Sequence, residues 1–94
     1  MLVRVVKMHF SSAFAAEFKA IFKAVQPKIE AVEGCTAVQL LQDHNTPEIF
    51  FTISHWQSEE HLNTYRNSEL FTTTWAVVKP NFQFKAEAWS LLNT

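Results

Sequence analysis

Histidine and tyrosine are the residue types in this sequence whose placement points to acid–base chemistry. The 94-residue chain holds four histidines and one tyrosine. We expect His9 and His55 near the ends of two strands and His61 in the first turns of a helix. Because a histidine titrates near neutral pH, each of these three is a candidate general base. The alternative for each is a half-exposed polar position without a catalytic role, and His44 is expected in a solvated turn.

Tyr65 follows His61 by four residues, so both side chains should lie on one helix face. If that face borders a pocket, the Tyr65 hydroxyl can hydrogen-bond an oxygen of a substrate. The alternative is that Tyr65 packs on the sheet beside Leu62 and its hydroxyl reaches water. The next residue, Arg66, could orient a carboxylate or a carbonyl, or it could face solvent.

Three aromatic residues, Phe51, Phe71 and Trp75, are candidates for contact with a substrate. Trp75 lies one turn beyond Phe71, a spacing that fits a pocket wall and a core position equally well. Metal binding is not expected, because His55 and His61 are separated by a strand–helix boundary and no CxxC or HExxH motif is present.

The elements that position these residues are clearest between 49 and 79. Residues 48–56 are rich in β-branched and aromatic side chains, which predicts a strand. Ser58 is a good helix N-cap, and the acidic residues after it favour the positive end of a helix dipole. Ser68 predicts a second helix start after a short break, and Pro80 marks the end of the helical region.

The remainder of the chain predicts three more strands and one more helix. We expect strands over residues 2–10, 35–42 and 84–92, the last with Phe84, Ala86 and Ala88 on one face. A helix is expected over residues 13–32. Pro27 should kink that helix or end it near Gln26, because proline lacks the backbone N–H. Gly34 is placed to act as a left-handed C-cap.

The predicted order is strand, helix, strand, strand, helix, strand, which defines a ferredoxin-like α+β domain over residues 1–94. Such a domain has a four-stranded antiparallel sheet with helices on one face. Strand 48–56 is apolar on both faces, whereas helices can cover only one. We therefore expect the other face to pack against a second copy of the chain, giving a homodimer.

Composition excludes several classes of partner. The net charge of −1 and the scattered basic residues give no footprint for nucleic acid or for a membrane surface. No run approaches the roughly 18–20 apolar residues needed to span a bilayer, and no apolar signal-peptide region is present. The single cysteine, Cys35, excludes an internal disulfide. These features predict a cytoplasmic, single-domain protein.

Two segments resemble the antibiotic biosynthesis monooxygenase (ABM) domain family. They are 56-WQSEE-60 and 65-YRNSELF-71, and 33-EGC-35 is similar to the family's Glu-Gly turn. The resemblance implies a dimeric α+β barrel with a pocket between the sheet and the later helices. It also implies a cofactor-independent monooxygenase whose partners are dioxygen and a small aromatic, phenolic or quinol-like compound.

The sequence departs from two branches of that family. Haem-degrading relatives use an Asn on strand one, a Trp on the second helix and a later His, where this chain has Val6 or Lys7, Tyr65 and Trp75. Haem binding is therefore not expected. Quinol-oxidising relatives often carry two histidines in the segment that matches 65–71, where Tyr65 and Leu70 stand here. These departures leave a second hypothesis, a non-catalytic small-ligand-binding or dimerisation module of the same fold.

Overall fold

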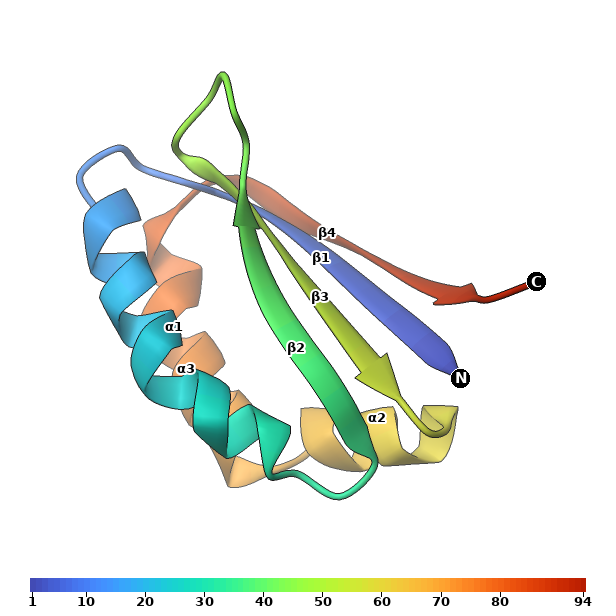
Figure 1. The fold of residues 1–94 in the computed structure, drawn as a ribbon. Helices are drawn as coiled ribbons and strands as arrows, with labels where there is room; N and C mark the ends of the chain where they lie inside the picture. The colour runs from blue at the N-terminus through green and yellow to red at the C-terminus, as the bar shows by residue number, and fades with distance from the viewer.

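The computed structural model describes residues 1–94 and has the predicted order of strands and helices (Figure 1). The strands are β1 (Leu2–Phe10), β2 (Cys35–Gln42), β3 (Ile49–Trp56) and β4 (Phe82–Leu92). The helices are α1 (Ala15–Glu30), α2 (Glu59–Arg66) and α3 (Glu69–Val78), followed by the 3₁₀ helix η1 (Lys79–Asn81). None of the helices is long and apolar enough to cross a bilayer.

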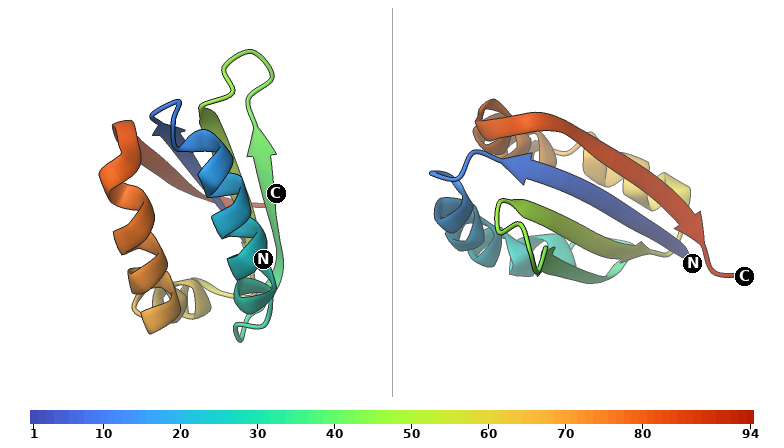
Figure 2. Two further views of the ribbon diagram at one scale, coloured as in Figure 1. Left: turned by 90° about the vertical axis from the view of Figure 1, so that its left-hand side faces the viewer. Right: turned by 90° about the horizontal axis from the view of Figure 1, so that it is seen from above.

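The four strands form one antiparallel sheet in the order β2-β3-β1-β4, so the first and third strands are central. The helices lie on one face of this sheet, and the other face is left uncovered (Figure 2). This is the predicted ferredoxin-like α+β fold. Below, the face that carries the helices is called the inner face, and the opposite one the outer face.

Phenylalanine rings build most of the core between the inner face and α1. Phe10 of β1 lies 4.5 Å from Phe18 of α1, measured between ring centroids, and Phe18 lies 5.1 Å from Phe50 of β3. Phe14 and Phe22 extend this cluster along the helix, and all five side chains are buried. Each buried aromatic ring removes a large apolar area from water, which is how a short chain can stabilise a single core.

Helix α1 continues through Pro27 to Glu30, so the predicted end near Gln26 was wrong. Proline removes only the hydrogen bond that its own N–H would donate, and the three residues after it complete the last turn. The carbonyl that loses its partner belongs to Lys23, an exposed residue, and can bond to water. Buried Ile29 holds the last turn against the core, and the Gln26 side chain donates a hydrogen bond to the carbonyl of Val38.

The break between α2 and α3 confirms the prediction from the two serines. The Ser58 hydroxyl accepts a hydrogen bond from the backbone N–H of His61, and the Ser68 hydroxyl accepts one from the N–H of Phe71. Each serine thereby satisfies a donor that the first helical turn leaves unpaired. The two helices therefore start at fixed positions, which sets the direction in which Tyr65, Phe71 and Trp75 point.

The outer face is largely apolar on β3, as the alternation in strand 48–56 predicts, with Lys7 and two histidines among the apolar residues. The central pairs Val3–His55, Val5–Ile53 and Lys7–Phe51 lie on this face. On β4, however, Phe84 lies on the outer face with Glu87, instead of sharing the inner face with Ala88 as predicted. A β-bulge opposite Met8 adds one residue between Phe84 and Glu87. The β4 residues before the bulge therefore face the side opposite to the one that strict alternation gives.

Candidate functional site

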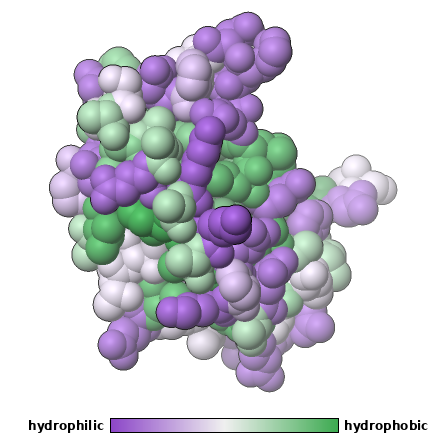
Figure 3. All heavy atoms as spheres, turned by 60° about the vertical axis from the view of Figure 1, so that its left-hand side comes forward, coloured by the Kyte–Doolittle hydropathy of each residue, from purple (hydrophilic) through white to green (hydrophobic).

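A cavity of about 310 Å³ lies between the inner face of the sheet and the helices. Of its 21 lining residues, 15 are hydrophobic, so its walls are suited to an apolar ligand. Figure 3 shows hydrophobic residues at the surface on the helical side of the molecule, among polar ones. Each α-helix and each strand contributes lining residues, so nearly the whole fold shapes the cavity.

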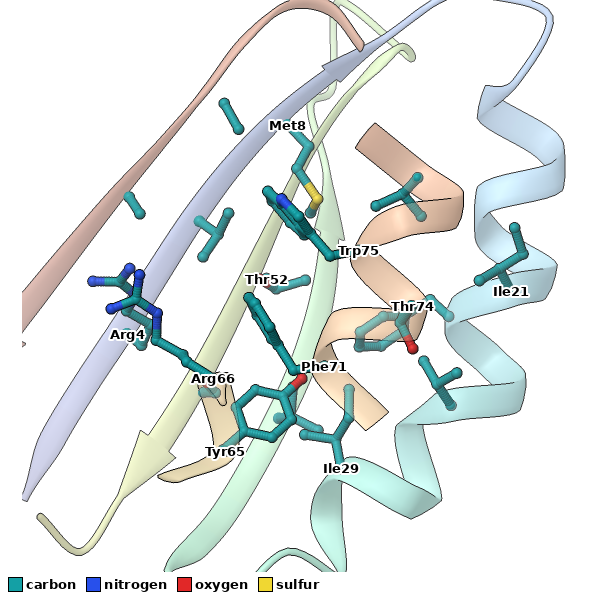
Figure 4. Close-up of a pocket in the computed structure, with 18 of the residues that line it drawn as sticks. Arg4, Met8, Ile21, Ile29, Thr52, Tyr65, Arg66, Phe71, Thr74 and Trp75 are labelled. Carbon is teal, nitrogen blue, oxygen red and sulfur yellow. The ribbon is translucent and has the colours of Figure 1, made fainter. Parts of the chain in front are cut away.

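One wall of the cavity is a continuous series of aromatic contacts. The Tyr65 ring stacks on Trp56 at 5.0 Å between centroids and meets Phe71 edge-on at 5.3 Å. Phe71 in turn stacks on Trp75 at 5.7 Å, with the two planes 11° apart. Tyr65, Phe71 and Trp75 all line the cavity (Figure 4). Such a wall offers flat π surfaces against which another ring can stack.

The Tyr65 hydroxyl is the phenol donor of this cavity. Figure 4 shows it beside Phe71, among the lining side chains. It makes no hydrogen bond to another group of the chain within the usual geometric limits. Burial, with a smaller contribution from the charge of the Cys35 thiolate, raises the pKa of Tyr65 to about 12. Tyr65 is therefore a neutral phenol at physiological pH, able to donate a hydrogen bond to a ligand oxygen.

Two arginines, Arg4 of β1 and Arg66 of α2, reach one end of the cavity (Figure 4). Arg4 is half-buried on the inner face, and its guanidinium donates a hydrogen bond of 2.9 Å to the hydroxyl of Ser90. Burial and the nearby charge of Arg66 lower the pKa of Arg4. No carboxylate pairs with either arginine, because the ion pair in the structure joins Lys7 to Glu87 at 3.9 Å.

Arg4 is the cavity residue that the sequence interpretation missed. Its signal was present in the alternation of β1, where Leu2, Arg4, Val6 and Met8 occupy successive inner-face positions. A charged residue in the middle of an apolar, core-facing series is unusual unless it is paired or faces a cavity.

The three candidate histidine bases do not line this cavity. His55 and His9 lie on the outer face, where they pair in the sheet with Val3 and Ile49. His61 lies at the start of α2, where its Nδ1 is 2.7 Å from the Ser58 hydroxyl. Phe51, a predicted substrate contact, is also on the outer face, whereas Arg66, Phe71 and Trp75 join Tyr65 at the cavity.

The polar groups of the cavity are few, and its charged lining residues are Arg4, Arg66 and Glu87, the last paired with Lys7. Thr52, Ser54 and Thr74 contribute hydroxyls to the lining, and the Ser54 oxygen accepts a hydrogen bond from the indole N–H of buried Trp56. No cluster of three His, Cys, Asp or Glu side chains that could hold a metal ion occurs. The arrangement can enclose a flat apolar molecule, donate a hydrogen bond to one of its oxygens, and attract a negative charge at one end.

Fold and cavity together define a class, that of small ferredoxin-like α+β domains with a cavity between the sheet and the helices. Within that class, the chain belongs to the antibiotic biosynthesis monooxygenase family, whose sequence model matches residues 1–76. The match confirms the resemblance seen at the Trp56–Glu60 and Tyr65–Phe71 segments. No curated protein matches the chain as a sequence relative.

Solved structures of related proteins share the fold along the entire chain. A crystal structure of an antibiotic biosynthesis monooxygenase superposes with a TM-score of 0.93 at 16% identity, covering 100% of this chain and 99% of that one. A conserved protein from Methanosarcina mazei gives a TM-score of 0.91 at 21% identity, covering 100% and 94%. A protein from Mycobacterium tuberculosis gives 0.90 at 14% identity, covering 99% and 94%. At these identities the likeness establishes the fold.

Proposed function

We propose that this protein is a cofactor-independent monooxygenase that oxidises a small aromatic phenol or a similarly activated ring compound. The observation that carries the proposal is the apolar cavity walled by Tyr65, Phe71 and Trp75, with a neutral phenol donor in that wall. Membership of the family supports the reaction class. The volume of about 310 Å³ is roughly twice that of an engineered cavity that accommodates benzene, which suits a ligand of about two rings.

Such a reaction needs an electron-rich substrate anion and an enclosed space more than it needs a cofactor. Loss of a proton from the phenol gives an anion that transfers one electron to dioxygen, and the two radicals then combine at carbon. For 1-naphthol, attack at the carbon opposite the hydroxyl and loss of water give the quinone. One atom of dioxygen enters the product and the other leaves as water, so the four electrons lost by the naphthol as a whole match the four accepted by dioxygen.

In the proposed reaction, each of these cavity residues has a separate role. Tyr65 donates a hydrogen bond to the substrate oxygen, where negative charge develops. Phe71 and Trp75 hold the ring flat and exclude water from it, and Arg66 orients a polar substituent. The proposal assigns no role to His9, His55 or His61, since none of them lines the cavity.

A second candidate function is a non-catalytic module that binds a small aromatic ligand. The absence of histidine from the cavity favours this alternative, and the one lining carboxylate, Glu87, is paired with Lys7, so no free common base lines the cavity. The two candidates share the cavity and differ only in turnover.

We also propose that a second copy of the chain covers the outer face, giving a homodimer. Phe84 is 60% exposed, Leu91 50% and Trp89 42%, and all three lie on that face. Together with Val5 and Ile53 they form an apolar surface that is large for a monomer of this size. The cavity is on the inner face, so each subunit of such a dimer would keep its own site.

Oxygen uptake with a panel of phenols tests the proposed activity. We expect at least one compound of the size of 1-naphthol or anthrone to consume dioxygen well above its spontaneous rate, one dioxygen for each quinone formed. With labelled dioxygen, mass spectrometry should find one labelled oxygen atom in the quinone. Tight binding of these compounds without oxygen uptake would favour the binding module, and hydrogen peroxide without label in the product would contradict monooxygenation.

A further inference from the structure

The two arginines at the end of the cavity form a positive pair that the chain itself does not neutralise. The single ion pair of the structure joins Lys7 and Glu87, which face each other across β1 and β4. Arg4 has the Ser90 hydroxyl as its only hydrogen-bond partner, and Arg66 has no side-chain partner. Two like charges therefore meet at the wall of an apolar cavity without an anion between them.

This arrangement costs the folded protein free energy. Burial and the charge of Arg66 both lower the pKa of Arg4, which means that the environment disfavours its charged form. Buried charges in native proteins are normally paired, and like charges close together repel. An anion held by both guanidinium groups would remove both penalties at once, because each group can offer two N–H donors to two oxygens or to one shared oxygen.

The position of the pair relative to the aromatic wall then defines the ligand. Figure 4 shows Arg4 and Arg66 next to each other at one end, with Tyr65, Phe71 and Trp75 continuing along the cavity. A ligand that satisfies both regions has a flat apolar body and an anionic oxygen at one end. The cavity volume limits that body to about two rings.

We propose that Arg4 and Arg66 form an anion clamp, and that the cavity takes its aromatic ligand as an oxyanion, either a carboxylate or a phenolate. The inference deepens the proposed function and rests on it, because the ligand of the clamp is the substrate of that reaction. For a phenol, the clamp favours the ionised form in the site. The proton can leave to water, and no histidine or carboxylate base is required.

Other titratable groups near the clamp do not compete with the ligand. Tyr65 of α2 is a neutral phenol because of its raised pKa and can only donate to the same oxyanion. Glu87 of β4 also lines the cavity, but its carboxylate pairs with Lys7 at 3.9 Å and makes no ion pair with either arginine. From β3, the hydroxyls of Thr52 and Ser54 line the cavity. The clamp therefore stays positive at neutral pH, and the ionisation of the ligand sets the pH dependence of binding.

Binding of three two-ring probes to the full chain tests the clamp by calorimetry. We expect 2-naphthoate to bind at least tenfold more tightly than its neutral isostere 2-naphthamide. For 1-naphthol, absorbance should show that the pKa of the bound phenol lies at least one unit below that of the free phenol. The results with 2-naphthoate and with 1-naphthol thus distinguish a carboxylate ligand from a phenolate ligand.

Two substitutions test whether Arg4 and Arg66 cause the preference for the anionic ligand. Arg66→Met and Arg4→Met should each weaken 2-naphthoate binding by about tenfold to a hundredfold, the range for a lost hydrogen bond to a charged group, and leave 2-naphthamide unaffected. Lys19→Met, which removes an exposed charge on α1, should change neither. Because Arg66 is exposed, we expect Arg66→Met to fold, and this variant can test the clamp even if Arg4→Met does not fold.

Equal affinity for 2-naphthoate and 2-naphthamide, or an equal loss of both ligands in the arginine variants, would overturn the clamp. Oxygen uptake is measured separately. Uptake with a phenol whose bound pKa is unshifted would refute the clamp and leave the proposed function standing. Charge-dependent binding of 2-naphthoate without oxygen uptake on any phenol would support the clamp and refute the proposed function.

Discussion

The phenol ring of Tyr65 stacks on the indole of Trp56, with 5.0 Å between the centroids and 26° between the planes. Trp56 is fully buried at the end of β3, and its N–H is bonded to the Ser54 hydroxyl. The tyrosine ring therefore rests on a fixed support, while its hydroxyl has no partner in the chain. A ring that is structural at one face and unsatisfied at its polar end is suited to hold a ligand oxygen in place.

The first prediction separates these two parts of Tyr65. Tyr65→Phe should leave the melting temperature nearly unchanged, because the stacked ring remains and no intramolecular hydrogen bond is lost. If the hydroxyl stabilises an oxyanion, turnover in an oxygen-uptake assay should fall by about a hundredfold to a thousandfold. Tyr65→Ala should instead lose about 3–5 kcal/mol of stability in denaturant unfolding, by analogy with Phe→Ala. Full activity in Tyr65→Phe would show that Tyr65 packs in the core and that its hydroxyl has no role in the reaction.

The second prediction concerns the ionisation of Tyr65, the only tyrosine in the chain. Ultraviolet titration of the folded protein should show a tyrosinate midpoint near pH 12, because burial raises the pKa of Tyr65 to about 12. In denaturant the midpoint should return to about 10. Below pH about 10 the phenol is neutral in both states, and between about 10 and 12 only the unfolded chain ionises. Stability should therefore fall across that interval, and less so in Tyr65→Phe; a folded midpoint near 10 would contradict the burial.

The third prediction concerns Gly34, whose φ of 86° is left-handed. A Cβ atom at this position would also collide with the His61 ring. Gly34→Ala should therefore destabilise the protein by at least about 1–3 kcal/mol, the cost of a strained backbone alone. The double variant Gly34→Ala with His61→Gly should recover the part due to the collision, which involves the Cβ as well as the ring of His61, and retain the part due to the backbone. Additive effects of the two substitutions in denaturant unfolding would show that the His61 side chain does not matter.

The fourth prediction concerns association through the outer face. Sedimentation at micromolar concentration should find a dimer, with an interface that buries more than about 1,000 Å² in total. Trp89→Glu places a charge on the outer face and should give a monomer. Val77→Glu is the matched control, because Val77 is an exposed apolar residue of α3 on the helical side and should leave the dimer intact. A wild-type monomer would refute the proposal.

Local chemistry made much of the fold predictable from the sequence. The two serine caps and the β-branched and aromatic residues of β3 are local features, and they gave the two helix starts and the position of that strand. Of the two outcomes predicted at Pro27, the helix end near Gln26 was wrong, because proline removes only the hydrogen bond of its own N–H, here to the carbonyl of the exposed residue Lys23. The β4 bulge was missed because it is a property of the pairing with β1.

The site was less predictable for the same reason. Phe71 and Trp75 share a helix with regular spacing, so their common wall follows from sequence. Arg4 meets Arg66 only because β1 and α2 come together in the fold, 62 residues apart in numbering (66 minus 4). His55 and His9 were attractive by residue type, yet which side of a strand they occupy depends on the register with their neighbours.

The most direct test of the account fills the cavity without touching its polar groups. Ala88 lies on the inner face of β4 and lines the cavity, whereas Ala20 of α1 is exposed and does not line it. In an oxygen-uptake assay with 1-naphthol, Ala88→Leu should lose most of the activity of the wild-type protein, and Ala20→Leu should keep it, at similar melting temperatures. Equal activity of both variants with the wild-type protein would contradict the claim that oxidation takes place in this cavity.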